Sequence, residues 1–230
     1  MRKSLTYKIL AAVLTLSAAN WAVPANVLAG EVDTDGKYIV TDDGETISDS
    51  YNGVYGNGHS FTINGGTIDG DVFGVGDESY TGDASGGNVT INGNATVTGN
   101  VFGGNSSFGD SANDNTVNIS GGSVTGDVYG GNSSFGDSAN DNEIIISGSA
   151  DIENANLYGS YSASGTGNTL TIDGWSSKTN TVQNFNDIAF KNINWNENKP
   201  VLTITAGDLT NTKLIPFTLQ AEAILTLANQ

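Results

Sequence analysis

The side chains of this sequence that could do chemistry are nearly all acidic. An identical stretch, G-G-N-S-S-F-G-D-S-A-N-D-N, occupies residues 103–115 and 130–142 and carries two aspartates in each copy. The four aspartates are Asp110, Asp114, Asp137 and Asp141. If the copies stack on neighbouring turns at the spacing of β-strands, equivalent carboxylates lie about 5 Å apart. Either the loops then splay into water, or a cation binds between carboxylate and asparagine oxygens, which are ligands that suit calcium.

Catalytic arrangements are hard to find in this chain. Glycoside hydrolases use paired carboxylates, and Asp42-Asp43-Gly44 is the clearest adjacent pair, but a following glycine is typical of a turn. His59 is the only histidine, and no serine and aspartate at a suggestive spacing complete a triad with it. We therefore predict no catalytic residues and no enzyme, with calcium as the one candidate cofactor. A polysaccharide-acting enzyme on the same scaffold is the alternative.

Charge and cysteine content exclude further classes of function. The chain has 8 Lys and Arg against 25 Asp and Glu, a net charge of −17, and no Lys or Arg lies between residues 38 and 177. Binding to nucleic acid requires basic side chains that neutralise phosphates, so we expect no nucleic-acid partner. Cysteine is absent, which excludes disulfides and thiolate metal sites.

The first 29 residues have the three parts of a secretory signal. Arg2, Lys3 and Lys8 form a positive start, residues 9–19 form an apolar core, and Val27-Leu28-Ala29 supplies small residues before a cleavage site. The apolar run is shorter than the roughly 20 residues that span a bilayer. We predict export and cleavage between Ala29 and Gly30.

The rest of the chain is organised by repeats. Strands with alternating apolar and polar residues are followed by glycine-rich corners, then by a second short strand, another corner and a polar loop. The two identical stretches begin 27 residues apart, at Gly103 and Gly130, and a period of this length is typical of a solenoid, whose units bury their apolar faces only by stacking. We predict an all-β fold, a right-handed parallel β-helix of about four to six coils. The division is 1–29 signal peptide, 30–58 N-terminal strands acting as a cap, 59–175 repeat solenoid, and 176–230 continuation with an irregular tail.

Stacking in register predicts ladders of equivalent residues. One inner ladder consists of Ile63, Ile91, Ile119, Ile146 and Ile172, and a second consists of Val72, Val101, Val128 and Leu157. An aromatic ladder, Phe73, Phe102, Tyr129 and Tyr158, runs beside the valines. It reads as a structural stack at a corner, with a carbohydrate-binding platform as the alternative. At the preceding turn Asp71, Asn100, Asp127 and Asn156 alternate, which keeps carboxylates two coils apart.

These repeats, followed by N-F-N-D-I-A-F-K-N-I and V-L-T-I-T-A-G-D-L-T-N-T, resemble the passenger region of bacterial autotransporters over residues 51–212. The resemblance implies a β-solenoid displayed outside a Gram-negative cell, an outer-membrane translocator barrel as partner, and a host-surface or matrix ligand. Only some 55 residues follow Trp175, too few for such a barrel. The chain is then either a truncated passenger or a protein exported alone.

The function expected is thus that of a non-catalytic stalk or adhesin, located at the cell surface or outer membrane or released outside the cell. Besides the enzyme, a stand-alone secreted structural protein stabilised by calcium is the other alternative.

Overall fold

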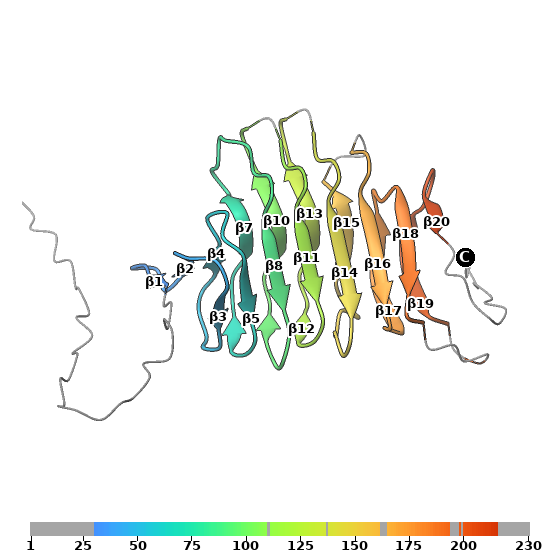
Figure 1. Ribbon diagram of the computed structural model, residues 1–230, viewed down its shortest axis with the longest axis horizontal. Helices are drawn as coiled ribbons and strands as arrows, with labels where there is room; N and C mark the ends of the chain where they lie inside the picture. The colour runs from blue at the N-terminus through green and yellow to red at the C-terminus, as the bar shows by residue number, and fades with distance from the viewer. Residues whose placement is uncertain are drawn as a thin grey trace, which may run out of the picture.

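The computed structural model describes residues 30–109, 111–136, 138–161, 165–193, 198 and 200–215. These residues form an all-β fold without helices, a parallel β-solenoid of about six turns, which confirms the predicted fold class (Figure 1). No helix that could cross a membrane occurs among them. The predicted signal peptide and its last residue, Ala29, lie outside the described residues, as does the tail from Pro216.

Three sheets form the walls of the solenoid. The strands of the nine-stranded sheet are, in spatial order, β1 (Glu31–Val32), β2 (Tyr38–Ile39), β4 (Val54–Tyr55), β7 (Val72–Asp77), β10 (Val101–Ser106), β13 (Val128–Ser133), β15 (Asn156–Ser160), β17 (Ser177–Gln183) and β19 (Leu202–Asp208). Those of the eight-stranded sheet are β3 (Glu45–Ile47), β5 (Phe61–Ile63), β8 (Asn88–Ile91), β11 (Thr116–Ile119), β14 (Glu143–Ser147), β16 (Thr169–Asp173), β18 (Asp187–Lys191) and β20 (Lys213–Ile215). The three-stranded sheet consists of β6 (Thr67–Ile68), β9 (Thr96–Val97) and β12 (Ser123–Val124).

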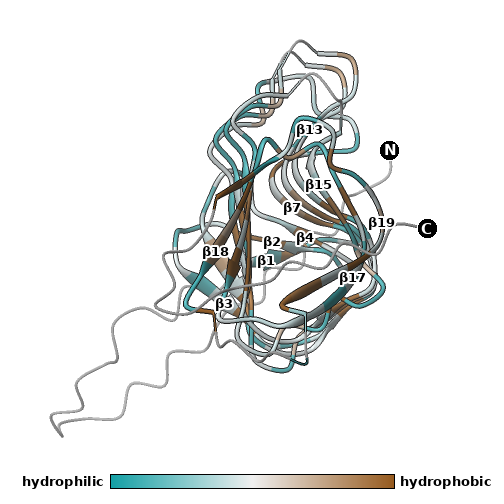
Figure 2. Cartoon of the chain, turned by 90° about the vertical axis from the view of Figure 1, so that its right-hand side faces the viewer, coloured by the Kyte–Doolittle hydropathy of each residue, from teal (hydrophilic) through white to brown (hydrophobic). Residues whose placement is uncertain are grey.

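The ladders of equivalent residues fix the register of the stack. In the eight-stranded sheet Ile63 pairs with Ile91, Ile91 with Ile119, and the series continues through Ile146 and Ile172. In the nine-stranded sheet the series is Val72, Val101, Val128 and Leu157. Every one of these side chains has 0% of its surface exposed. Apolar side chains from the sheets form one core inside the walls, and each buried member stabilises the fold by about 1.5–3 kcal/mol. Figure 2 looks along the stack, with the chain coloured by hydropathy.

The third sheet corrects the expected composition of one coil. Two strands a coil were predicted, with T-V-T-G-N-V-F as a single strand, but the structure divides this stretch into β9 and β10. The break falls at Gly99, where a Cβ would lie 2.3 Å from the carbonyl oxygen of Gly70 in the turn before. Only glycine permits the two backbones to approach this closely, so the corner turns there. Ile68, Val97 and Val124 of the short sheet form an additional buried ladder.

The two ends of the described stack differ. At the N-terminal end β1 pairs antiparallel with β2 and covers the edge of the nine-stranded sheet, whereas all other strand pairs are parallel. Toward the other end the apolar ladder of the eight-stranded sheet continues past the prediction, from Ile172 to Phe190. Strand β19, the last of its sheet, is largely exposed. The solenoid thus continues beyond residue 175 in the same sheets.

Truncation of one ladder residue should destabilise the whole stack. Ile119 is fully buried between Ile91 and Ile146, so Ile119→Ala is expected to lower the free energy of unfolding by about 2–5 kcal/mol. Ile119→Val, the matched control, should cost only about 0.5–1.5 kcal/mol. Urea denaturation followed by circular dichroism measures both, and equal effects of the two variants would contradict this packing.

Candidate functional site

Three loops project from one side of the solenoid, after β7, β10 and β13 (Figures 1 and 2). We call them the loop ridge, residues 78–87, 107–115 and 134–142; Asp110 and Asp137 lie outside the described residues. The Ala84 amide donates to the Ser111 carbonyl at 2.9 Å, and the Ala112 amide donates to the Ser138 carbonyl at 2.9 Å. The duplicated loops therefore stack in register and do not splay apart.

A small second core supports the loop ridge. Val75, Ala84 and Ala112 are buried together, and Tyr80 packs against them. Strand β10 is buried along its whole length, from Val101 to Ser106, because the loops cover the outer face of its second half. The sequence predicted a glycine corner and then a polar loop after Phe102, so the continuation of the strand to Ser106 is a correction. Small side chains at the alanine positions let the loops lie directly on the sheet.

A ladder of buried asparagines joins the loop ridge to the eight-stranded sheet. Asn115, Asn142 and Asn168 are each at most 1% exposed and lie one turn apart, just before β11, β14 and β16. Asn142 Oδ1 accepts from the Asn115 backbone amide at 3.0 Å and from its Nδ2 at 2.9 Å. Asn168 Oδ1 accepts from Asn142 in the same two ways, at 3.0 and 3.1 Å. Each turn thus satisfies buried donors of the turn before it.

The asparagine amide suits this ladder because it carries both an acceptor and two donors. Its free hydrogen reaches the loops, since Asn115 Nδ2 also donates to the Ala84 carbonyl at 3.1 Å and Asn168 Nδ2 to the Ala139 carbonyl at 2.9 Å. The neighbouring glycine makes room, because a Cβ on Gly104 would lie 2.5 Å from Asn115 Nδ2. Sequence reasoning missed this ladder. The recurring N-T-V and N-E-I entries into the strands were the available signal.

The described aspartates of the duplicated loops lie at left-handed backbone positions. Asp114 has φ 56° and Asp141 has φ 54°, and both side chains are exposed. The Asp114 amide donates to the Asn140 carbonyl and the Asp141 amide to the Thr166 carbonyl, so their backbones belong to the stack. Glycines with positive φ stand at the equivalent positions on either side, Gly86 and Gly167. The two like charges are therefore flanked by uncharged residues and face water.

The described residues bring few acidic side chains together. Among them, no three His, Asp or Glu side chains gather into a group that could hold an ion. The loop ridge contributes Asp114 and Asp141, while the other two calcium candidates, Asp110 and Asp137, lie outside the described residues.

The alternating acid and amide ladder is joined by hydrogen bonds. Asp71 accepts from the Asn100 amide at 2.7 Å, Asn100 accepts from the Asp127 amide at 2.9 Å, and Asp127 accepts from Asn156 Nδ2 at 2.6 Å. Asn156 in turn accepts from Asn180 Nδ2 at 2.7 Å. The asparagines separate the carboxylates and also link one turn to the next.

The aromatic ladder is a packed stack. The rings of Phe73 and Phe102 lie 5.1 Å apart at 5°, and those of Phe102 and Tyr129 lie 4.9 Å apart at 5°. Tyr158 continues the series at 4.8 Å. Burial, and then the neighbouring Asp127 that accepts from its hydroxyl at 3.1 Å, raises the pKa of Tyr129. Phe73 is 0% and Phe102 8% exposed, so neither presents a ring face to a sugar.

A different aromatic pair is exposed on the loop ridge. Phe108 and Phe135, equivalent residues of the two identical loops, are 61% and 80% exposed. Their rings stack 5.8 Å apart at 9°. The Phe108 amide donates to the Tyr80 carbonyl at 3.0 Å, which fixes this part of the loop to the turn before it. Sequence reasoning treated these residues only as part of the repeated motif.

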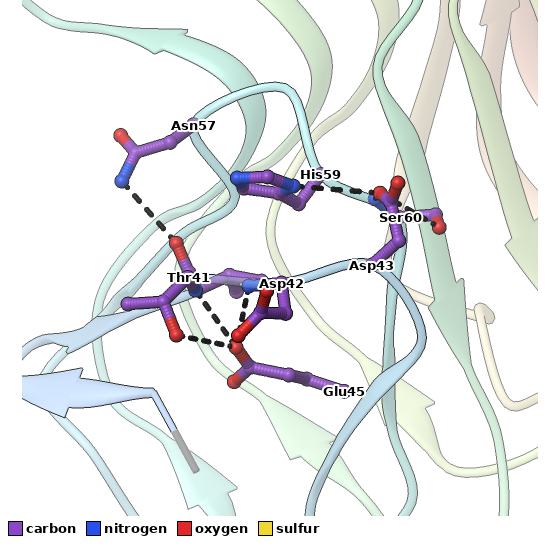
Figure 3. A network of polar contacts seen from close by, with 8 residues as sticks. Thr41, Asp42, Asp43, Glu45, Asn57, His59 and Ser60 are labelled. Atoms are coloured by element: carbon purple, nitrogen blue, oxygen red, sulfur yellow. Dashed lines mark hydrogen bonds and ion pairs between the residues drawn. The ribbon is translucent and has the colours of Figure 1, made fainter. Parts of the chain in front are cut away.

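His59, Asp43 and Ser60 lie close together but are not arranged as a catalytic triad (Figure 3). His59 Nδ1 lies 3.5 Å from Asp43, but the Ser60 hydroxyl donates to that same carboxylate at 3.3 Å and not to the imidazole. The Ser60 amide also donates to Asp43 at 2.8 Å. Asp43 therefore joins two neighbouring coils of the solenoid, and the Ser60 hydroxyl is bonded to its carboxylate and not to a base, as a triad would require.

An open depression at the glycine corners offers no better site for hydrolysis. Gly93, Ala95, Ser123 and Asp151 are among its lining residues, and Asp151 is the single carboxylate in that lining. Glycoside hydrolysis by the common mechanisms requires two.

Comparison with models of protein families, with curated protein sequences and with solved structures gives no match. The structure by itself establishes the class of this protein, a parallel β-solenoid.

Removal of one buried amide should unpair two donors at once. Asn142→Ala leaves the backbone amide and the side-chain amide of Asn115 without their acceptor, so the free energy of unfolding is expected to fall by at least about 2 kcal/mol. Asn94→Ala, at an exposed position, is the control and should cost less than about 0.5 kcal/mol. Urea denaturation gives both values. An Asn142→Ala variant as stable as the unaltered protein would contradict the role of Asn142 as acceptor for Asn115.

Removal of one charge from the loop ridge should stabilise the stack. Asp141→Asn keeps a side chain that tolerates φ 54° and removes repulsion with Asp114, so unfolding at low salt is expected to cost about 0.2–1 kcal/mol more. The gain should shrink in about 1 M salt, where charges are screened over roughly 3 Å. If calcium binds between these carboxylates, Asp141→Asn will instead lower the melting temperature in its presence.

Proposed function

We propose that this protein is an exported, non-catalytic structural solenoid that acts by contact, through the exposed phenylalanines of the loop ridge. The observation that carries the proposal is the stacked pair Phe108 and Phe135, which stands outside both hydrophobic cores. Burial of such rings against another molecule recovers free energy that the fold itself does not obtain. The role is that of a stalk or adhesin.

The architecture supports a rigid, extended presentation of this surface. The hydrophobic core is continuous from Tyr38 to Leu202, and the asparagine ladder fastens the loops to it. A stack of this kind keeps both phenylalanines at a fixed spacing without any ligand. Preorganisation of this kind lowers the entropic cost of binding.

The cellular setting is part of the proposal and follows from the sequence. The signal-like N-terminus supports export, and the resemblance to autotransporter passengers supports display at the surface of a Gram-negative cell with an outer-membrane translocator as partner. The acidic surface favours a neutral or basic ligand on a host cell or matrix, and disfavours nucleic acid. The arrangement of Asp43, His59 and Ser60 gives the enzyme alternative no support.

Loss of the two rings should weaken attachment without unfolding the protein. Beads coated with the purified protein are counted on epithelial cell monolayers, and Phe108→Ser with Phe135→Ser is expected to reduce attachment at least about fivefold, as for central interface aromatics. The melting temperature should stay unchanged because both rings are exposed.

The matched control replaces both rings by tyrosine, which keeps their stacking surface and should retain attachment. Failure of the unaltered protein to attach, or equal attachment by the serine variant, would contradict the proposed role.

A further inference from the structure

A buried carboxylate lies in the N-terminal turn of the solenoid. Glu45 begins β3 and is only 2% exposed. Its Oε1 accepts from the Thr41 amide at 2.7 Å, the Thr41 hydroxyl at 3.0 Å and the Asp42 amide at 2.9 Å (Figure 3). Its Oε2 accepts from the Tyr38 hydroxyl at 2.7 Å. None of the ion pairs among the described residues includes Glu45, although a buried charge is normally paired.

The backbone of Gly30 lies directly against this carboxylate. The Gly30 nitrogen donates to the Tyr38 hydroxyl at 2.7 Å, the same hydroxyl that donates to Glu45. A Cβ built on Gly30 would lie 2.7 Å from Glu45 Oε2 and 2.3 Å from the Ile39 carbonyl oxygen. The antiparallel pairing of Glu31 with Ile39 directs the chain to this position. No side chain larger than hydrogen fits at residue 30 without displacement of its neighbours.

The sequence predicts signal-peptide cleavage at this same residue. Hydrolysis breaks the bond between the Ala29 carbonyl carbon and the Gly30 nitrogen: the hydroxyl of water goes to the carbon and its hydrogen to the nitrogen. The amine so formed takes up a further proton from solvent at neutral pH. One hydrogen of this ammonium group can keep the bond to the Tyr38 hydroxyl, and its other two are available to Glu45. We propose that processing completes a binding site: the new α-ammonium group of Gly30 pairs with Glu45 and locks the N-terminal cap onto the stack.

The chemistry of the site fits a cation. Burial acts to raise the pKa of Glu45, but the hydrogen bonds from Tyr38, Thr41 and Asp42 outweigh it and hold that pKa below its usual range. Burial, together with the bond to Glu45, raises the pKa of Tyr38 to about 12. The carboxylate is therefore charged and the phenol neutral at physiological pH. The amide nitrogen of Gly30 in the uncleaved chain supplies one hydrogen-bond donor and no charge. The ammonium group supplies three donors and a positive charge.

The consequence is a cap whose strength depends on processing. Strand β1 has two residues, both exposed, and packs little apolar surface of its own. The ion pair would anchor this strand through Gly30, the residue that precedes it. A chain that still carries its leader has the same strands but lacks the charge, so its N-terminal turn should open more readily. This inference concerns the end of the stack and is independent of the role proposed for the loop ridge.

Two measurements test the proposal. Mass spectrometry of the exported protein is expected to give Gly30 as the first residue, and a different start would overturn it. Thermal melts then compare three chains: one that begins at free Gly30, one with Gly30 acetylated, and one that retains Ala29. The free Gly30 chain is expected to melt about 3–6 °C above the other two. The chain that begins at Ala29 also has a charged terminus, but this charge is displaced from Glu45 by one residue. Equal melting of the three chains would overturn the proposal.

Variants assign the effect to Glu45. In Glu45→Gln the advantage of the free Gly30 chain should disappear, whereas in Asp43→Asn, which changes a neighbouring exposed acid, it should persist. An advantage that survives Glu45→Gln would contradict the ion pair. If Glu45→Gln does not fold, hydrogen exchange in the unaltered sequence decides: the Thr41 and Asp42 amides should exchange faster after acetylation, and equal exchange would overturn the proposal.

Discussion

The structure depends on one constraint, that buried donors of one turn find their hydrogen-bond acceptors in a neighbouring turn. The ladder of Asn115, Asn142 and Asn168 makes this constraint explicit, since the side-chain oxygens of Asn142 and Asn168 each accept from both the backbone amide and the side-chain amide of the asparagine one turn earlier. A slip of one residue would leave these buried groups unpaired, at a cost of about 1–3 kcal/mol each. The apolar ladders add stability, but apolar contacts alone are not directional. The amides therefore specify the register within which the isoleucines pack.

The same register makes high negative charge tolerable. In-register stacking places each residue above its own equivalent, so a repeated aspartate would meet like charge at every turn. Two devices prevent this. Along one ladder Asn100 stands between Asp71 and Asp127 and bonds to both. On the loop ridge Asp114 and Asp141 are adjacent, but Gly86 and Gly167 end the series at the same backbone position. Among the described residues of these two series, like charges are thus adjacent only at Asp114 and Asp141, which face water.

Much of the fold could be predicted because its signals are local. Alternation with period two in V-T-I and V-N-I located the strands of the eight-stranded sheet, and glycine pairs located corners. The third sheet was not predicted, because strands of two residues such as Thr96–Val97 are too short to show a period. The asparagine ladder was missed for a different reason. Asn115 is polar and adjoins a loop, and only its neighbours in other turns make it buried. The signal peptide, and with it the cleavage site, stays a prediction.

Two series of phenylalanines show how packing and function separate in a repeat protein. Phe73 and Phe102 stack within the wall and are nearly inaccessible, so their ring surface contributes to folding. Phe108 and Phe135 stack at a similar distance but remain mostly exposed, so little of their surface contributes. Replacement by a polar residue would cost the fold almost nothing at the second pair and much at the first. An exposed aromatic pair held by ordered backbone is unexplained by stability alone, and burial against a partner is the event in which such rings contribute free energy.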